Sequence, residues 1–299
     1  MRVFVTGATG FIGSAIVQDL IGAGHKVLGL ARSDTAAASL AAAGADVHRG
    51  SLDDLESLRS GAAAADGVIH TAFNHNFATF KSNCEADRPI IEALGAALAG
   101  SERPLIVTSV TALLKGQPAT EDEMPSSRTT SNPRIISDQA ADSIVARGVR
   151  VSVVRLPPSV HGDGDYGFVP LLIGMARQKG VVAYVGEGLN LWPAVHRFDA
   201  GRLYRLALEK GAAGARYHAV AEEGVPFRDI ANVIGRRLDM PVVAMSSEKA
   251  AEHFGWFAHF AALDNPASSK RTRETLNWQP TQPGLISDLD RPHYFEHKT

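Results

Sequence analysis

Short apolar runs alternate with segments of helical periodicity through the first two thirds of the chain. Around Ile16, Leu20 and Ile21, for example, apolar residues recur at the spacing of one helix face. Such alternation is typical of βαβ units that build a parallel sheet covered by helices on both faces. The pattern predicts a doubly wound α/β fold with six parallel strands, at Val3–Thr6, Lys26–Leu30, Asp46–Arg49, Gly67–Thr71, Leu105–Ser109 and Val151–Leu156.

The pattern changes after Leu156, where two prolines and three glycines lie between Pro157 and Gly167. Regular helix or strand is not expected in that segment. A helix opening at Asp199 and a strand over Ala215–Val220 would then return the chain to the sheet, and the remainder looks largely helical. We therefore predict a large α/β domain over residues 1–160 and 195–220 and a smaller lobe over residues 161–194 and 221–299.

Composition narrows the class of protein. Of 299 residues, 45% are hydrophobic, and 30 basic side chains nearly balance 32 acidic ones, so nucleic acid and anionic membranes are not expected partners. The single cysteine, Cys84, excludes an internal disulfide framework. No apolar run approaches the ~20 residues of a membrane span. These features predict a globular protein of the cytoplasm.

The first predicted strand leads into a glycine loop, Gly7-Ala8-Thr9-Gly10-Phe11-Ile12-Gly13, and then into an amphipathic helix. In that context Gly7 allows the tight turn, Gly10 lets the backbone approach a pyrophosphate, and Gly13 lets helix and strand pack closely. The helix N-terminus adds oriented N–H groups. The loop therefore predicts a dinucleotide site, the alternative being a glycine-rich turn that only packs.

The region at the end of the second strand indicates which dinucleotide is preferred. An acid there would accept hydrogen bonds from a ribose hydroxyl, whereas an arginine suits a 2′-phosphate. Arg32 occupies that place and Ser33 follows it, so the sequence favours NADP(H). In the alternative, Arg32 is a solvated surface residue, Asp34 takes the ribose, and NAD is bound.

Other strand ends should border the same ligand, because ligands bind at the carboxyl ends of parallel strands. Ser51 and Leu52 follow the third strand, and His70-Thr71-Ala72-Phe73 end the fourth. For His70, a buried imidazole with its hydrogen bonds satisfied is an equally good interpretation.

With these features the chain resembles the extended short-chain dehydrogenase/reductases, a family of NAD(P)-dependent epimerases, dehydratases and reductases. The motifs that match are Thr6-Gly7-x-x-Gly10-x-x-Gly13, Val68-Ile69-His70-Thr71-Ala72, Asn83, Val107-Thr108-Ser109, Arg155-Leu156-Pro157-Pro158-Ser159-Val160-His161-Gly162 and Val195-His196-Arg197-Phe198-Asp199. The resemblance implies that Asn83, Thr108 and the segment Leu156–Ser159 also border the cofactor. It further implies a homodimer formed through two long helices, Cys84–Ala99 and Ile135–Arg147.

The family's catalytic pair is missing. Its members carry a tyrosine four residues before a lysine, and here Arg134 and Asp138 occupy those positions. The lysine lowers the pKa of the tyrosine so that it can donate a proton. Arginine stays protonated, so Arg134 could stabilise a negative substrate oxygen but could not exchange a proton. Alternatively, Arg134 and Asp138 form an ordinary ion pair along one helix.

Three further residues are catalytic candidates. Ser109 and Thr111 carry hydroxyls near the family's serine position, and His161 is a suitable acid in a glycine-rich segment. Against this, His161 could be a packing replacement for an aromatic residue.

The predicted substrate site draws on both parts of the chain. Its candidates are Phe73, Tyr166, Asn190, Trp192 and His196. Trp192-Pro193 suggests a rigid wall for an apolar or aromatic substrate, although Trp192 could simply anchor the lobe. No metal-binding motif is present, because His253 and His259 are spaced onto different helix faces.

These residues favour an NADP(H)-dependent oxidoreductase that acts on a small organic carbonyl or related metabolite through a non-standard site. A second hypothesis is a catalytically silent NAD(P)-binding sensor. A third is a sugar-nucleotide epimerase or dehydratase. This hypothesis is the least compatible with loss of the tyrosine, because those reactions depend most directly on it.

Overall fold

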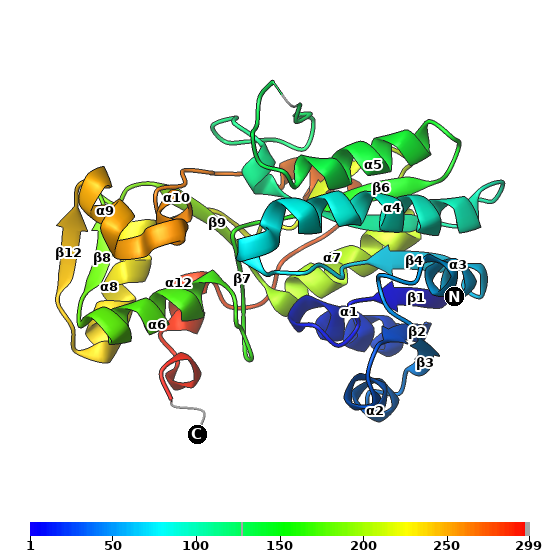
Figure 1. Ribbon diagram of the computed structural model, residues 1–299, viewed down its shortest axis with the longest axis horizontal. Helices are drawn as coiled ribbons and strands as arrows, with labels where there is room; N and C mark the ends of the chain where they lie inside the picture. Colours follow the sequence, from blue (N-terminus) through cyan, green and yellow to red (C-terminus); the bar gives the residue numbers. More distant parts are fainter. Residues whose placement is uncertain (127, 297–299) are drawn as a thin grey trace.

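Seven strands form one sheet in the order β10-β6-β5-β4-β1-β2-β3, and every neighbouring pair is parallel. The computed structural model describes residues 1–126 and 128–296 (Figure 1). The strands are β1 (Arg2–Thr6), β2 (Lys26–Ala31), β3 (Asp46–Arg49), β4 (Gly67–His70), β5 (Leu105–Val110), β6 (Val151–Leu156) and β10 (Arg216–His218). The predicted parallel sheet is confirmed. Its first six strands end within one residue of their predicted ends.

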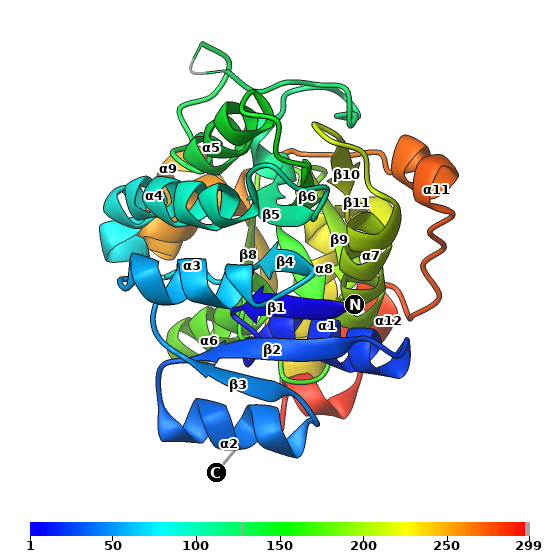
Figure 2. The same cartoon turned by 90° about the vertical axis from the view of Figure 1, so that its right-hand side faces the viewer.

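Helices cover both faces of this sheet (Figure 2). On one face lie α1 (Phe11–Gly22), α2 (Asp34–Ala42) and α7 (Arg197–Lys210). On the other lie α3 (Leu55–Ala63), α4 (Phe80–Leu98) and α5 (Ile135–Val145). None of the helices in the described ranges is long and apolar enough to span a membrane.

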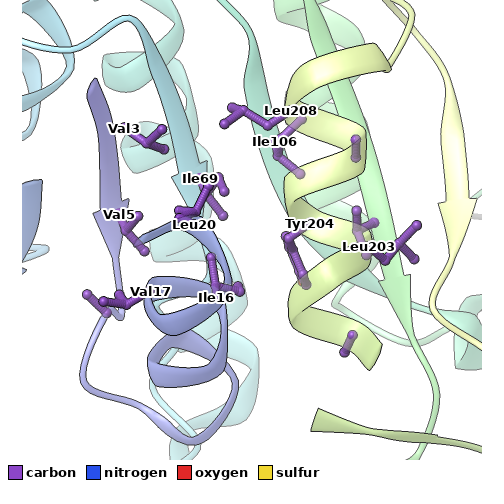
Figure 3. Packing of buried hydrophobic residues seen from close by; sticks show 14 of the residues in the cluster. Val3, Val5, Ile16, Val17, Leu20, Ile69, Ile106, Leu203, Tyr204 and Leu208 are labelled. Carbon is purple, nitrogen blue, oxygen red and sulfur yellow. The ribbon is translucent and has the colours of Figure 1, made fainter. Parts of the chain in front are cut away.

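The alternation of side chains along β1 shows how the two cores arise. Val3 and Val5 point toward α1 and α7, where they join Ile16, Leu20 and Leu203 (Figure 3). Phe4 points to the opposite face and packs with Leu58 of α3. Successive side chains of a strand face opposite ways, so a strand covered on both faces must be apolar at successive positions, as β1 is from Val3 to Val5.

A second region lies beside the large sheet in Figure 1 and is called here the small-sheet region. It contains a three-stranded sheet, β11-β9-β7, and a two-stranded sheet, β12-β8. Its elements are β7 (Ser159–His161), α6 (Phe168–Lys179), β8 (Val182–Val185), β9 (Leu191–His196), β11 (Glu222–Pro226), α8 (Phe227–Leu238), β12 (Val242–Met245), α9 (Ser247–Phe254), α10 (Ala258–Ala261) and α12 (Leu285–Leu289).

The expectation that no strand forms between Pro157 and Gly167 was wrong. β7 forms there because it pairs with β9, with Ser159 opposite Ala194 and His161 opposite His196. That partner lies more than 30 residues further along the chain, so local sequence gives no sign of it.

Pro193 lies inside β9, the central strand of its sheet. Proline has no N–H to donate to a strand ladder. The partner strand β11 shifts its register at this point, between Glu222 opposite Ala194 and Val225 opposite Trp192. The irregularity therefore falls where the ladder lacks a donor.

Part of the C-terminal region returns to the large sheet. Leu276, at the end of α11 (Lys270–Leu276), and Trp278 are wholly buried in the core beneath α7. The indole nitrogen of Trp278 donates to the carbonyl oxygen of Asp199 at 3.0 Å. These contacts hold the N-terminal turn of α7 in place.

Candidate functional site

The glycine loop lies at the carboxyl end of β1 and has no room for side chains at two positions. A Cβ added at Gly13 would lie 1.9 Å from the carbonyl oxygen of Gly7. Gly7 itself has a φ of 70°, and a Cβ there would lie 2.7 Å from the amide nitrogen of Ala72. Both contacts are impossible for real atoms, so the local fold requires glycine at both places.

The start of α1 is suited to an anion. Its cap residue, Gly10, offers no side chain, and its first turn contains no acidic residue. The helix therefore has unsatisfied N–H groups and a positive dipole end at the edge where β1 and β4 finish. This arrangement fits the pyrophosphate of a dinucleotide.

Two arginines lie at the ends of β2 and β3. Arg32 directly follows β2 and is exposed, while Arg49 ends β3 opposite Ala31. Arg49 forms an exposed ion pair with Asp34, the residue that would accept a ribose hydroxyl in the alternative prediction. Ser33 caps α2, because its hydroxyl oxygen accepts from the amide of Ala36 at 3.2 Å. The edge is therefore positively charged around the predicted 2′-phosphate position.

The other predicted cofactor positions differ in exposure. Those exposed or half-buried are Gly7, Thr9, Gly10, Phe11, Ile12, Ser51, Leu52, Thr71, Ala72, Phe73, Asn83, Thr108 and Pro158. Those buried are Gly13, His70, Leu156, Pro157 and Ser159. The first group is the one whose surface is open to a ligand.

Asn83 lies inside α4, because that helix begins at Phe80 and not at Cys84 as predicted. Its amide nitrogen donates to the carbonyl oxygens of Asn74 at 3.1 Å and Asn76 at 3.0 Å. Asn83 thus fixes the segment between β4 and α4 and reaches the site only through that segment.

Arg134 is buried in a charged network whose members lie far apart in the sequence. Its guanidinium donates to Asp87 at 3.2 Å and to the carbonyl oxygen of Thr108 at 3.0 Å. It also lies over the ring of Phe73, 4.1 Å from the centroid. Arg134 is therefore held at the carboxyl end of β5, beside a residue of the predicted site.

The same network extends to the end of β1. His70 contacts Asp87 at 3.0 Å through Nε2 and Thr6 at 2.7 Å through Nδ1. The imidazole is buried with both nitrogens partnered, which matches the structural interpretation of His70. Burial alone would raise the pKa of Asp87, but hydrogen bonds from His70 and Ser137 and the charge of Arg134 hold that pKa below its ordinary value.

Asp138 belongs to a different network. Its carboxylate accepts from Arg155 at 3.0 Å and from the hydroxyl of Ser109, and Arg216 lies 3.7 Å away. Arg155 and Asp138 are almost fully buried. The alternative prediction of an ion pair between Arg134 and Asp138 was therefore wrong, because each side chain faces a partner on another element.

The predicted roles of Ser109 and Thr111 do not agree with their placement. Both hydroxyls are buried, and Thr111 donates to the side-chain oxygen of Asn265 at 2.8 Å. Since strand side chains alternate, the residue between them, Val110, is the one that remains partly exposed. Neither hydroxyl is presented to a substrate oxygen.

His161 is also buried. Its Nδ1 lies 2.9 Å from Asp288, and its ring packs edge-on against His196. His196 caps α7, with Nδ1 accepting from the amide of Phe198 at 3.3 Å. Both histidines thus hold β7, β9 and α7 together, and the predicted roles in catalysis and substrate binding do not match these positions.

Asp165 gives a prediction on stability. It accepts from the amide of Gly167 at 2.7 Å and from the hydroxyl of Tyr294 at 3.2 Å. Desolvation, with a contribution from Asp288, raises the pKa of Asp165 to about 6. Because this folded-state pKa lies above the unfolded value, the stability that the protonated group contributes is complete below about pH 4 and is lost as the pH rises through about 6.

We therefore expect Asp165→Asn to stabilise the protein by about 1–3 kcal/mol at pH 8 and to have little effect near pH 4. Urea unfolding of the variant and the wild type at both pH values measures this difference. Asp163→Asn is the matched control, since that carboxylate is 67% exposed. An equal gain at both pH values would contradict the argument.

The other predicted substrate residues differ in how far they are exposed. Trp192 is fully buried in the core of the small-sheet region, so the prediction that it walls the substrate site was wrong. The amide of Asn190 donates to the carbonyl oxygens of Ala261 and Leu263, which secures a loop. Tyr166 is 67% exposed and Phe73 half-buried, so these two can contact a ligand.

The structure adds an aromatic surface that sequence analysis did not predict. Phe77 stacks on Trp256 with centroids 4.6 Å apart and on Phe80 at 5.4 Å, and Phe80 meets Phe73 at 6.0 Å. Trp256 is 52% exposed. The rings thus run from Arg134 to the small-sheet region. The spacing of Phe73, Phe77 and Phe80 was a usable signal, but their partner Trp256 lies far away in sequence.

His75 is a titratable side chain on this surface. Its ring meets Phe73 edge-on at 5.2 Å, and part of it is exposed. Desolvation, with a smaller contribution from the charge of Arg134, lowers the pKa of His75. Its imidazole is therefore neutral at physiological pH and can accept a proton.

No group of three or more His, Cys, Asp or Glu side chains within residues 1–126 and 128–296 is arranged to hold a metal ion.

Comparisons place this geometry among known proteins. A sequence profile described as the NAD dependent epimerase/dehydratase family matches residues 3–221. An uncharacterised protein of Schizosaccharomyces pombe is 52% identical over 99% of this chain and 100% of its own length. A Dictyostelium discoideum sterol-4-alpha-carboxylate 3-dehydrogenase, decarboxylating, is 29% identical over 76% of this chain and 73% of its own. The crystal structure of a dTDP-glucose 4,6-dehydratase from Streptomyces venezuelae, with NAD and TYD bound, covers 98% of this chain and 96% of its own at a TM-score of 0.76 and 21% identity.

Proposed function

Because the chain belongs to the NAD dependent epimerase/dehydratase family, we propose that it is an NADP(H)-dependent oxidoreductase acting on a small apolar carbonyl compound or the corresponding alcohol. The observation that carries the proposal is the glycine loop. Neither Gly7 nor Gly13 has room for a Cβ atom, so no side chains cover the backbone at these positions by the start of α1. Arg32 and Arg49 at the neighbouring strand ends favour the 2′-phosphate of NADP(H).

The aromatic surface supports an apolar substrate. Phe73 lies against Arg134, and Phe80, Phe77 and Trp256 continue the ring surface away from it. A partly exposed set of rings is suited to planar or aliphatic ligands. The Dictyostelium discoideum relative is a sterol-4-alpha-carboxylate 3-dehydrogenase, and a sterol skeleton is compatible with this class of substrate. A sugar-nucleotide reaction is not proposed.

The bound cofactor would supply or accept the hydride. The chain's own residues would act on the substrate oxygen: Arg134 provides a fixed positive charge near it, which favours negative charge developing there. His75 would take the proton from a substrate hydroxyl or return it in the reverse direction. Ser109, Thr111 and His161 have no part in this proposal, because their polar groups are buried in contacts with Asp138, Asn265 and Asp288.

A second candidate function is a cofactor-binding sensor without chemistry. One observation favours it: both positions of the family's catalytic pair are occupied by residues locked into buried ion pairs, Arg134 with Asp87 and Asp138 with Arg155.

A titration with NADPH and NADH, followed by oxidation assays with apolar ketones, aldehydes and quinones, tests the proposal. We expect the wild type to prefer NADPH and Arg32→Ala to weaken NADPH roughly tenfold, the value of one charge-assisted hydrogen bond, without affecting NADH. Arg59→Ala removes an exposed arginine of α3 elsewhere and is the control.

The outcomes separate the two functions. Binding with turnover supports the oxidoreductase. Binding without turnover across the panel favours the sensor, and failure to bind either dinucleotide would overturn both.

A further inference from the structure

Tyr166, from the segment after β7, reaches across to the glycine loop. Its hydroxyl accepts from the amide of Phe11 at 3.3 Å, and its ring meets the Phe11 ring edge-on at 5.9 Å. That amide is the first N–H group of α1, and a pyrophosphate at this helix end would compete for it. The side chain of Tyr166 is nonetheless 67% exposed, so it is not committed to this contact by packing.

Arg197, the first residue of α7, approaches the same loop. Its guanidinium donates to the hydroxyl of Ser14 at 2.6 Å and to the carbonyl oxygen of Asp163 at 2.8 Å. It also lies 4.6 Å from the centroid of the Phe11 ring. Arg197 and Tyr166 therefore enclose the start of α1 from the small-sheet side.

Arg197 forms no salt bridge with the residues that the structure describes. Among the described residues no carboxylate lies within ion-pair distance of it, and its hydrogen-bond partners are neutral. The carboxylate of the nearby Asp163 is instead paired with Arg291. A cation beside the positive end of a helix dipole is unfavourable unless an anion lies between them. Desolvation lowers the pKa of Arg197, although the charge of Asp163 acts in the opposite direction.

We infer that Arg197 and Tyr166 bind the pyrophosphate of the dinucleotide opposite the glycine loop, an inference that rests on the cofactor site proposed above. The pyrophosphate would supply the negative charge that Arg197 lacks and would accept from the Phe11 amide. The hydroxyl of Tyr166, released from that amide, can donate to a phosphate oxygen. Cofactor binding would then join Tyr166 of the small-sheet region to α1 and α7 on the large sheet.

Titration with NADPH at several salt concentrations tests this inference. We expect Arg197→Met to weaken NADPH binding roughly tenfold and to reduce the dependence of log Kd on log salt, because one charge contact is lost. Arg197→Lys should retain most of the salt dependence. The control is Arg202→Met, on the same helix, where the arginine pairs with Asp199.

Adenosine 2′-monophosphate, which lacks the pyrophosphate, distinguishes a specific contact from a general distortion. Arg197→Met should bind this probe as the wild type does, and thermal melting should show that the variant is folded. Tyr166→Phe should weaken NADPH binding about threefold, the value of one modest hydrogen bond.

Each contrary result has a distinct meaning. Wild-type NADPH binding with an unchanged Arg197→Met affinity and salt dependence would overturn the inference and leave the proposed function standing. Equal loss of NADPH and adenosine 2′-monophosphate would also overturn it, since the effect would then not be confined to the pyrophosphate. If the wild type binds neither NADPH nor NADH, the proposed function fails and this inference fails with it.

Discussion

Replacing Arg134 with tyrosine and Asp138 with lysine, which would introduce the family's standard pair, is expected to unfold the protein. Lysine at position 138 would place an ammonium group beside the buried Arg155 and within reach of Arg216, with no carboxylate between them. Tyrosine at position 134 would leave the buried Asp87 without its guanidinium. Breaking one buried pair costs about 3–5 kcal/mol, and two such losses approach the whole stability of a typical domain, about 5–15 kcal/mol.

Circular dichroism and urea unfolding measure this effect. Ala146→Lys, at the exposed C-terminal end of α5, adds the same charge without burial and should unfold like the wild type. If the double variant kept the wild-type unfolding midpoint, the two buried networks would not have the strength assigned to them. The family's chemistry therefore cannot be restored in this chain by changing these two positions alone.

Gly13→Ala is expected to abolish tight dinucleotide binding. Its Cβ would need the space 1.9 Å from the carbonyl oxygen of Gly7, so α1 and the loop must move apart. A displacement of about 1 Å can cost roughly a hundredfold where oriented groups must meet a ligand. Overpacking should also lower the free energy of unfolding by about 1–3 kcal/mol.

NADPH titration and urea unfolding of the variant test both effects. Gly22→Ala, at the far end of the same helix, is the matched control, because nothing lies within 4 Å of its added Cβ. Wild-type affinity in Gly13→Ala would show that the close approach of Gly13 to Gly7 is not needed for binding.

The strands of the large sheet could be predicted because their signal is local. A strand such as β1 is buried on both faces, so its whole run is apolar and its ends are marked by polar or glycine residues. The strands of the small-sheet region carry no comparable signal. β7 is three residues long, and β9 contains a proline, so both depend on partners distant in sequence.

The candidate site likewise has a part that local sequence predicts and a part that depends on residues distant in sequence. The glycine loop and the basic strand end at Arg32 are contiguous in sequence, and their residue types alone point to a dinucleotide. The partners of Arg134 and Asp138 were not predictable, because Asp87 lies 47 residues from Arg134 and Arg155 lies 17 residues from Asp138. Nor does sequence tell that the hydroxyls of Ser109 and Thr111 are both buried, or that Trp192 is buried while Trp256 is exposed.

The sequence by itself determined the parallel sheet, the family and the position of the glycine loop, since each rests on short-range periodicity or on a contiguous motif. The tertiary structure decided which side chains are available for chemistry. It buried Ser109, Thr111, His161 and Trp192, and it joined His75, Phe77 and Trp256 to the aromatic surface that begins at Phe73. The physical reason is that burial and charge pairing depend on contacts between elements far apart in the chain, which the local pattern of residues does not record.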